Sequence, residues 1–136
     1  MRVLVDTSAW IDFLNGHPSP QASAMARLIR EEADVVTCGV VVAEVLQGLR
    51  RPGTRAEIEG HLLDMEWLTP REPETYLEAA RVYRELRSRG ITIRSTIDCL
   101  IATLAAEHDV LLLSKDRDLQ LIVESGLLQV SALPVV

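Results

Sequence analysis

Short apolar segments alternate with longer amphipathic ones along the whole chain. A short run of β-branched and aliphatic residues predicts a buried strand, whereas apolar residues three or four positions apart predict a helix. Strands are predicted over residues 2–6, 34–38, 66–68 and 110–114, with a further edge strand over 127–131. Helices are predicted over residues 9–14, 21–32, 40–49, 56–64, 74–89, 95–108 and 118–125. This alternation predicts an α/β fold with a mostly parallel sheet and ligand groups at the carboxyl ends of its strands.

The length and composition are typical of one packed domain. A chain of 136 residues is near the commonest domain size, so we expect a single domain over residues 1–136. Hydrophobic residues make up 48% of the chain, yet no apolar run approaches the roughly 18 residues that span a bilayer. The first apolar run ends at Asp6, too early for a signal peptide, and Cys38 and Cys99 form no Cys-x-x-Cys pair. These features predict a cytoplasmic protein with two buried free thiols and no membrane partner.

The net charge of -6 argues against a protein that binds nucleic acid through a broad basic face. Any polyanion must therefore be recruited locally. Two groups of cations are candidates for that role: Lys115, and a rim of arginines at positions 84, 87, 89 and 94. Such residues are equally typical of a solvated surface, so both interpretations stay open.

Two aspartates follow predicted strands. Asp6 comes directly after the first strand and Asp116 soon after the strand at residues 110–114, so both are expected at one edge of the sheet. Either one also has a purely structural interpretation, because an Asp in that place caps the next helix and stabilises it by about 0.5 to 2 kcal/mol. Asp98 has a similar alternative, since it stands three residues after Ser95 at the spacing of a capping box.

Glu44 is the acid that a structural role explains least well. It lies in an apolar helix with no basic residue within four positions, and a buried carboxylate needs a charged partner, a metal ion or a proton. A distant Arg is one such partner. Converging carboxylates raise one another's pKa, whereas a divalent cation reverses that effect. Oxygen ligands without His or Cys favour magnesium or manganese over zinc or copper.

Four segments in order resemble the motifs of PIN-domain ribonucleases. They are Val3 to Ser8, Val42 to Leu49, Ser95 to Ala102 and Leu112 to Leu119. One segment alone is a weak signal, but four in order at suitable spacing are specific, and they span nearly the whole chain. Within that family, the length of the chain and the residues of its motifs most resemble VapC-type toxins of bacterial toxin-antitoxin pairs.

The resemblance implies a three-layer α/β/α sandwich around a mostly parallel sheet. The catalytic and metal-binding acids that it implies are Asp6, Glu44, Asp98 and Asp116. The auxiliary residues are Asp118, Thr7, Ser8 and Ser114. The hydroxyl groups of this second set are expected to orient water or a ligating carboxylate. Ser114 stands where many members of the family carry Thr, and it keeps the hydroxyl.

The function that the resemblance implies is that of a metal-dependent endoribonuclease, the toxin of a type II toxin-antitoxin system. Bound Mg²⁺ or Mn²⁺ would activate water to hydrolyse RNA phosphodiester bonds. The resemblance also implies a homodimer, and a small antitoxin that inserts a basic residue into the acidic pocket within a heterotetramer or larger complex. The apolar stretch at residues 40–49, together with the helices around it, likewise predicts a surface that a second copy covers. Which RNA is cut depends on the shape of the groove and on surface loops rather than on these motifs.

Three other classes of protein also carry acids after strands. A haloacid-dehalogenase-like phosphohydrolase needs a second Asp two residues after Asp6, where Ser8 stands. A phospho-receiver domain needs adjacent acids after the first strand and an acceptor Asp after the third, and residues 67–69 contain none. A degenerate PIN domain used only for binding would have lost some of its acids, whereas all four are present here.

Overall fold

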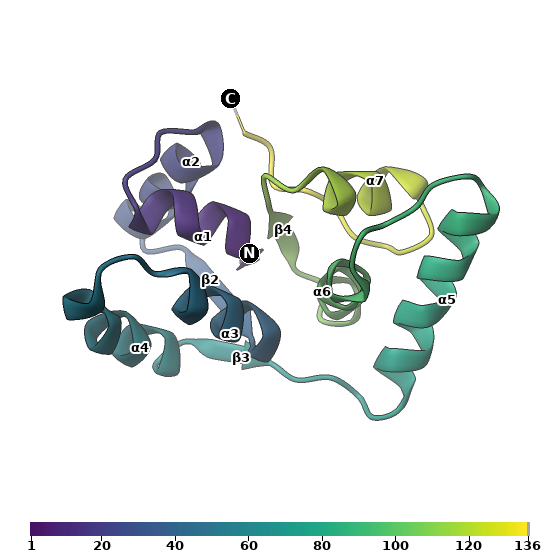
Figure 1. The fold of residues 1–136 in the computed structure, drawn as a ribbon, viewed down its shortest axis with the longest axis horizontal. Coiled ribbons are helices and arrows are strands. Elements are labelled where there is room, and N and C mark those ends of the chain that lie inside the picture. The colour runs from purple at the N-terminus through teal and green to yellow at the C-terminus, as the bar shows by residue number, and fades with distance from the viewer. Residues whose placement is uncertain (136) are drawn as a thin grey trace.

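The computed structural model describes residues 1–135 and contains a four-stranded sheet with helices around it (Figure 1). The strands are β1 (Arg2–Val5), β2 (Asp34–Cys38), β3 (Glu66–Leu68) and β4 (Leu111–Leu113). The helices are α1 (Thr7–Leu14), α2 (Pro20–Arg30), α3 (Gly39–Gly48), α4 (Arg55–Leu63), α5 (Glu74–Ser88), α6 (Thr96–Glu107) and α7 (Arg117–Ser125). A short 3-10 helix, η1 (Pro52–Thr54), precedes α4. No helix in this part of the chain is long and apolar enough to cross a membrane.

All strand pairings are parallel, and the spatial order of the strands is β3-β2-β1-β4. Val3 in β1 pairs with Val35 in β2 on one side and with Leu111 in β4 on the other. The chain therefore adds β2 and then β3 on one side of β1, and β4 pairs with the other side of β1. The direction of strand order reverses between β1 and β4, and open parallel sheets bind ligands at such a point, beyond the carboxyl ends of the strands.

Both faces of the sheet are covered. Val3, Leu4 and Val5 are consecutive in β1 and all are buried. Successive side chains of a strand point to opposite faces, so continuous burial requires packed layers on both sides. In Figure 1, α1 to α4 gather on the left of the view and α5 to α7 on the right. The expected three-layer α/β/α architecture is thus confirmed, and so are buried free thiols at Cys38 and Cys99.

Local sequence signals explain where several helices begin and end. Ser19 accepts a hydrogen bond from the backbone N–H of Ala22 at 3.0 Å, and Pro20 follows at the first helical position of α2. Ser95 caps α6 by accepting from the N–H of Ile97 at 3.1 Å. Gly126 ends α7 with φ +74°, a left-handed conformation that glycine adopts without steric cost.

The predicted edge strand over residues 127–131 is wrong. After Gly126 the chain packs Leu127 and Leu128 partly against the core instead of extending along the sheet. It reaches the free edge of β4 only at Ala132, which forms a single parallel bridge with Leu112. The hydrophobic pattern identified residues that contact the core, but not the direction in which the backbone passes them.

Within α3 itself, the prediction that residues 40–49 offer apolar surface to a second copy is not supported. Val41, Val42 and Val45 in α3 are buried within the single chain. Large apolar residues are exposed on other helices, among them Ile29 in α2, Leu77 in α5 and Leu63 in α4, which contacts α3. The apolar face of α3 is therefore used for the protein's own core.

Candidate metal centre

Asp6 and Asp116 lie at the carboxyl ends of the two strands between which the strand order reverses. Asp6 directly follows β1, and its backbone N–H donates to the carbonyl of Leu113 in β4 at 2.8 Å. Asp116 follows three residues after Leu113 and is the N-cap of α7. Parallel pairing of β1 with β4 therefore brings both acids to one edge of the sheet, as predicted.

Two serine hydroxyls hold the Asp6 carboxylate. Ser8 Oγ donates to Asp6 Oδ2 at 2.8 Å, and Ser114 Oγ donates to the same oxygen at 3.0 Å. The backbone N–H of Ser8 is a further donor at 3.3 Å, so Asp6 also caps α1. Asp6 is 4% exposed. Burial raises the pKa of Asp6, and these hydrogen bonds offset only part of that rise.

The two serines also connect the ends of the strands. Ser114 Oγ accepts from the N–H of Asp116 at 2.9 Å, and Ser8 Oγ accepts from the N–H of Lys115 at 2.9 Å. Each hydroxyl therefore uses both its donor and its acceptor capacity between β1 and β4. The loop that carries Asp116 is fixed relative to Asp6 by this arrangement.

Glu44 is less buried than its sequence neighbours suggested. Its side chain is half-buried, and Oε1 accepts from Thr7 Oγ1 at 2.7 Å. Neighbouring residues of a helix point about 100° apart, so the core contacts of Val42 and Val45 do not bury Glu44 to the same degree. This hydroxyl, from the N-terminal turn of α1, is a neutral partner, and the partial exposure of Glu44 reduces its need for a charged one.

Asp98 lies in the first turn of α6. The Ser95 hydroxyl caps this helix, whereas the Asp98 carboxylate accepts no hydrogen bond from the described residues, so the capping-box alternative is not supported. Partial burial raises the pKa of Asp98 to about 7, and the negative charges of Asp116, Asp6, Asp118 and Glu44 contribute to that rise. Repulsion from all four of these carboxylates therefore acts on Asp98.

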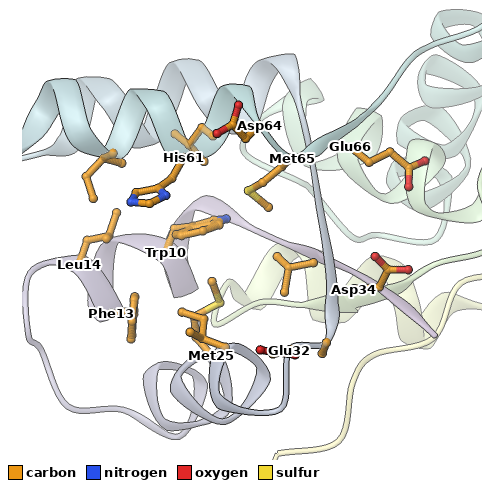
Figure 2. Close-up of a pocket in the computed structure, with 15 residues that line it drawn as sticks. Trp10, Phe13, Leu14, Met25, Glu32, Asp34, His61, Asp64, Met65 and Glu66 are labelled. Atoms are coloured by element: carbon orange, nitrogen blue, oxygen red, sulfur yellow. The ribbon is translucent and has the colours of Figure 1, made fainter.

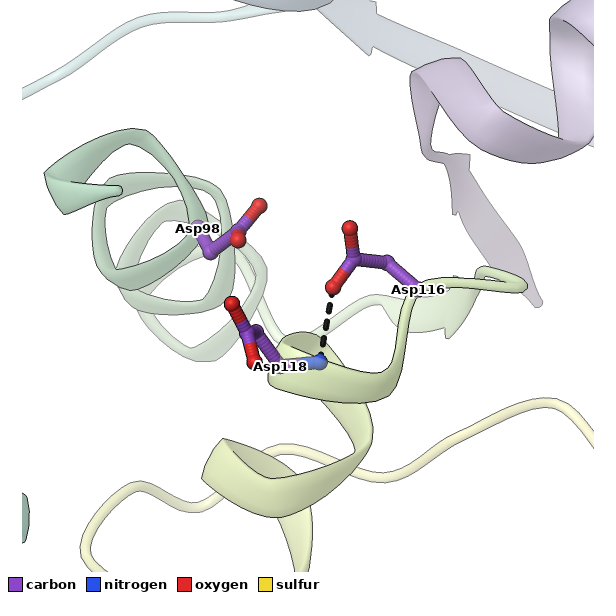
Figure 3. Close-up of side chains that lie close together, drawn as sticks. All are labelled: Asp98, Asp116 and Asp118. Carbon is purple, nitrogen blue, oxygen red and sulfur yellow. Dashed lines mark hydrogen bonds between the residues drawn. The ribbon is translucent and has the colours of Figure 1, made fainter. Parts of the chain in front are cut away.

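Asp98, Asp116 and Asp118 form the tightest group of acids (Figure 3). One oxygen of each lies within 4.8 Å of the others. Asp116 Oδ1 accepts from the N–H groups of Asp118 and Leu119 at 2.7 and 3.3 Å, which caps α7 and leaves Oδ2 free of that role. Asp116 therefore caps α7 and also belongs to the group of clustered acids.

Arg94 is a member of this site that the sequence identified only as one residue of a basic rim. Its backbone N–H and its Nε both donate to Asp118 Oδ2 at 3.1 Å. Its Nη2 lies 3.9 Å from Asp116 Oδ2. Burial alone would raise the pKa of Asp118, but the two hydrogen bonds and the charge of Arg94 hold it below its usual value. The one available sequence signal was the position of Arg94 beside the Ser95 cap.

The donor set fits a hard divalent cation. The three aspartates offer only carboxylate oxygens, which magnesium and manganese prefer. Ions of this charge would also relieve the repulsion that raises the pKa of Asp98. Asp6 and Glu44 are not in the group within 4.8 Å, but their charges act on Asp98. The structure therefore groups Asp98 and Asp116 with Asp118, whereas Asp6 and Glu44 lie outside this group and act on Asp98 through their charges.

Comparison with known proteins gives matches over nearly the whole chain. A family model described as "PIN domain" matches residues 3–124. The chain is 32% identical over 131 residues to "Ribonuclease VapC11" of Mycobacterium tuberculosis, covering 96% of this chain and 98% of the relative. It has the same identity and coverage with "VapC ribonuclease Mb1587" of Mycobacterium bovis.

Two solved structures share the fold at low sequence identity. The structure of VapBC-1 from nontypeable Haemophilus influenzae superposes with a TM-score of 0.69 at 19% identity, covering 97% of this chain and 98% of that chain. The structure of VapC20 from Mycobacterium tuberculosis, described as a "Sarcin-Ricin loop cleaving toxin", has a TM-score of 0.61 at 20% identity. It covers 91% of this chain and 95% of that chain.

Proposed function

Because this chain belongs to the PIN-domain family, we propose that it is a metal-dependent endoribonuclease and the toxin of a type II toxin-antitoxin pair. The observation that carries the proposal is the group of Asp98, Asp116 and Asp118 with oxygens within 4.8 Å, at the edge where the strand order reverses. Burial and the repulsion of neighbouring carboxylates raise the pKa of Asp98 to about 7, and a cation would relieve that repulsion. Relatives at 32% identity are named ribonucleases, which supports RNA as the substrate.

The residues that would hold the cation are Asp98 and Asp116, with Asp6, Glu44 and Asp118 completing the acidic surroundings. When bound, magnesium or manganese supplies Lewis-acid activation of the attacking water and neutralises charge on the phosphodiester. The chain's own hydroxyls fix the acids: Ser8 and Ser114 hold Asp6, and Thr7 holds Glu44. We propose an auxiliary, positioning role for these hydroxyls and for Asp118.

The function is tested by incubating the purified protein, free of any partner, with a single-stranded or looped RNA and with DNA of the same sequence, both in magnesium. We expect cleavage of the RNA at internal positions and much slower cleavage of the DNA, together with growth arrest when the protein is expressed alone. A protein that binds RNA without cleaving it would instead be a degenerate PIN domain. Faster cleavage of the DNA would contradict the assignment of RNA as substrate.

A cleft beside the sheet supports the antitoxin part of the proposal (Figure 2). It has a volume of about 570 Å³ and lies between α1, α2 and α4. Its walls include the apolar side chains of Phe13, Leu14, Ile29 and Met65. Acidic residues stand around this apolar surface, namely Glu32, Asp34, Asp64 and Glu66. An amphipathic segment with basic residues on its polar side would complement both features.

We propose that the occupant of this cleft is a segment of the cognate antitoxin, which would also place a basic residue among the acids of the metal centre. Arg is better suited than Lys to that second contact, because its planar fork can bridge two carboxylates. The resemblance to VapC-type toxins of toxin-antitoxin pairs supports such a partner, and the relatives at 32% identity carry the name VapC. A homodimer, a heterotetramer or larger complex, a single domain over residues 1–136 and a cytoplasmic location remain predictions.

Charge placed in the cleft is expected to weaken antitoxin binding without affecting the nuclease. Ile29 is 49% exposed at the cleft, so Ile29→Glu should fold normally while placing a charge against an apolar partner surface. We expect binding at least about tenfold weaker by calorimetry, equivalent to about 1.4 kcal/mol, with RNA cleavage by the free protein unchanged.

Leu77→Glu is the matched control for this experiment. Leu77 is 66% exposed on α5 and does not line the cleft. Equal losses of affinity in the two variants would indicate a general effect of added negative charge. Undiminished binding by Ile29→Glu would place the antitoxin on another surface.

A further inference from the structure

An RNA phosphodiester must approach several carboxylates on a protein whose net charge is -6. Of the basic side chains in residues 1–135, Arg94 is the one that comes within salt-bridge distance of the clustered aspartates, and it reaches two of the three, Asp116 and Asp118. Lys115, the other sequence-based candidate, is directed elsewhere, because its Nζ pairs with Asp12 Oδ2 at 2.7 Å. Arg94 is therefore the cation whose position the structure fixes at the site.

The Arg94 side chain is hydrogen-bonded at its Nε, yet most of it is exposed. Its backbone N–H and Nε both bind Asp118 Oδ2 at 3.1 Å, and the Asp118 side chain is only 9% exposed. The Arg94 side chain is nevertheless 77% exposed. The guanidinium is thus held through its Nε by a buried carboxylate, while most of the side chain faces solvent. A guanidinium ordered in advance loses less entropy when it binds a ligand.

The charge of Arg94 would become available when the site is loaded. Asp116 and Asp118 are the carboxylates that pair with the guanidinium. A divalent cation held by Asp98 and Asp116 would compete for their negative charge. The guanidinium would then lack a full counter-ion beside the place where the substrate binds. The planar fork of Arg matches the geometry of phosphate oxygens, whereas Lys presents a single point charge.

We infer that Arg94 binds a backbone phosphate of the RNA next to the bond that is cut. This inference rests on the proposed function and adds a residue that contacts the substrate. The contact is independent of sequence, because phosphate groups carry no base information. Arg94 thus supplies the local recruitment that the acidic surface of the protein does not provide.

The test is the salt dependence of RNA binding, measured by fluorescence anisotropy on a single-stranded RNA with calcium in place of magnesium. Loss of one phosphate contact reduces the slope of log K against log salt by about 0.7 for single strands. We expect Arg94→Gln to show this reduction and to bind RNA roughly 5- to 10-fold more weakly at about 0.15 M salt. Arg94→Lys, which keeps the charge, should retain most of the slope.

Two other arginines provide controls with the same change in net charge. Arg30 is exposed at the end of α2 that leads to β2, at the opposite edge of the sheet, and Arg30→Gln should leave the slope unchanged. Arg117 is exposed beside Asp116 but has no salt bridge to the clustered acids, and Arg117→Gln should change the slope less than Arg94→Gln does.

An unchanged slope in Arg94→Gln would overturn the inference. A fall in kcat at unchanged RNA affinity in both Arg94 variants would do the same, because it would show that Arg94 only positions Asp118. Failure of the wild-type protein to cleave any RNA would refute the proposed function instead. The binding measurements do not depend on cleavage, so the two failures are distinguishable. Thermal melting of each variant identifies any loss of folding. If Arg94→Gln does not fold, Arg94→Lys is compared with the wild type instead.

Discussion

Replacing Asp98 by Asn is expected to reduce RNA cleavage by roughly 10²- to 10³-fold, equivalent to about 3 to 4 kcal/mol of transition-state stabilisation. Asn keeps the shape of the side chain but removes the negative charge that would hold a cation. Asp6→Asn should give a loss of the same order, because Asp6 lies at the same sheet edge and its charge acts on Asp98. Single-turnover cleavage of a labelled RNA measures both effects.

The same Asp98 variant should be no less stable than the wild type when metal is absent. The pKa of Asp98 in the folded protein is raised from 3.8 to about 7. The folded state therefore binds this proton more tightly than the unfolded state, and stability is lost as the pH rises through that range. The wild type should lose stability between about pH 4 and pH 7, and Asp98→Asn should lose less. At about pH 8 the variant should melt higher than the wild type, and near pH 4 the two should converge.

Asp109→Asn is the matched control for these measurements. Asp109 is exposed at the far end of α6 with φ +54°, a conformation that Asn also tolerates. Asp109→Asn should retain full activity and the melting temperature of the wild type. If Asp98→Asn melted far below the wild type at every pH, the carboxylate would have a structural role, and its loss of activity would not report on metal binding.

Removal of divalent metal should abolish cleavage. With excess EDTA, RNA hydrolysis should fall at least about a hundredfold, and magnesium or manganese added beyond the chelator should restore it. The physical reason is that the clustered acids would repel the phosphodiester unless a cation neutralises them. Undiminished cleavage in excess chelator would refute a metal-dependent mechanism for this protein.

Thermal melting provides a measurement of metal binding that does not depend on activity. A ligand that binds only the folded state at about 100 times its Kd stabilises the protein by about 2.7 kcal/mol. Saturating magnesium should therefore raise the melting temperature of the wild type and of Asp109→Asn. It should raise that of Asp98→Asn much less. An equal rise in all three proteins would mean that the ion binds outside the candidate metal centre.

The sequence by itself determined the order of strands and helices and the acids that follow the strands. These features are local: hydrophobic periodicity separates strands from helices, and a residue just after a parallel strand lies at the carboxyl edge of the sheet. The family motifs added the expectation of a common site. The edge strand over residues 127–131 was the wrong element, because a run of apolar residues indicates burial and not the path of the backbone.

Only the tertiary structure decided which side chains meet and how exposed they are. Arg94 reaches Asp118 across 24 residues of sequence, and Lys115 reaches Asp12 across 103, so neither pairing has a local signal. Glu44 is half-buried although its helix is apolar, because burial depends on which face of the helix meets the core. Distances between segments follow from how the layers pack, which no short stretch of residues encodes. The sequence could therefore identify the acids of the candidate metal centre, whereas packing determined the arginine that binds one of them.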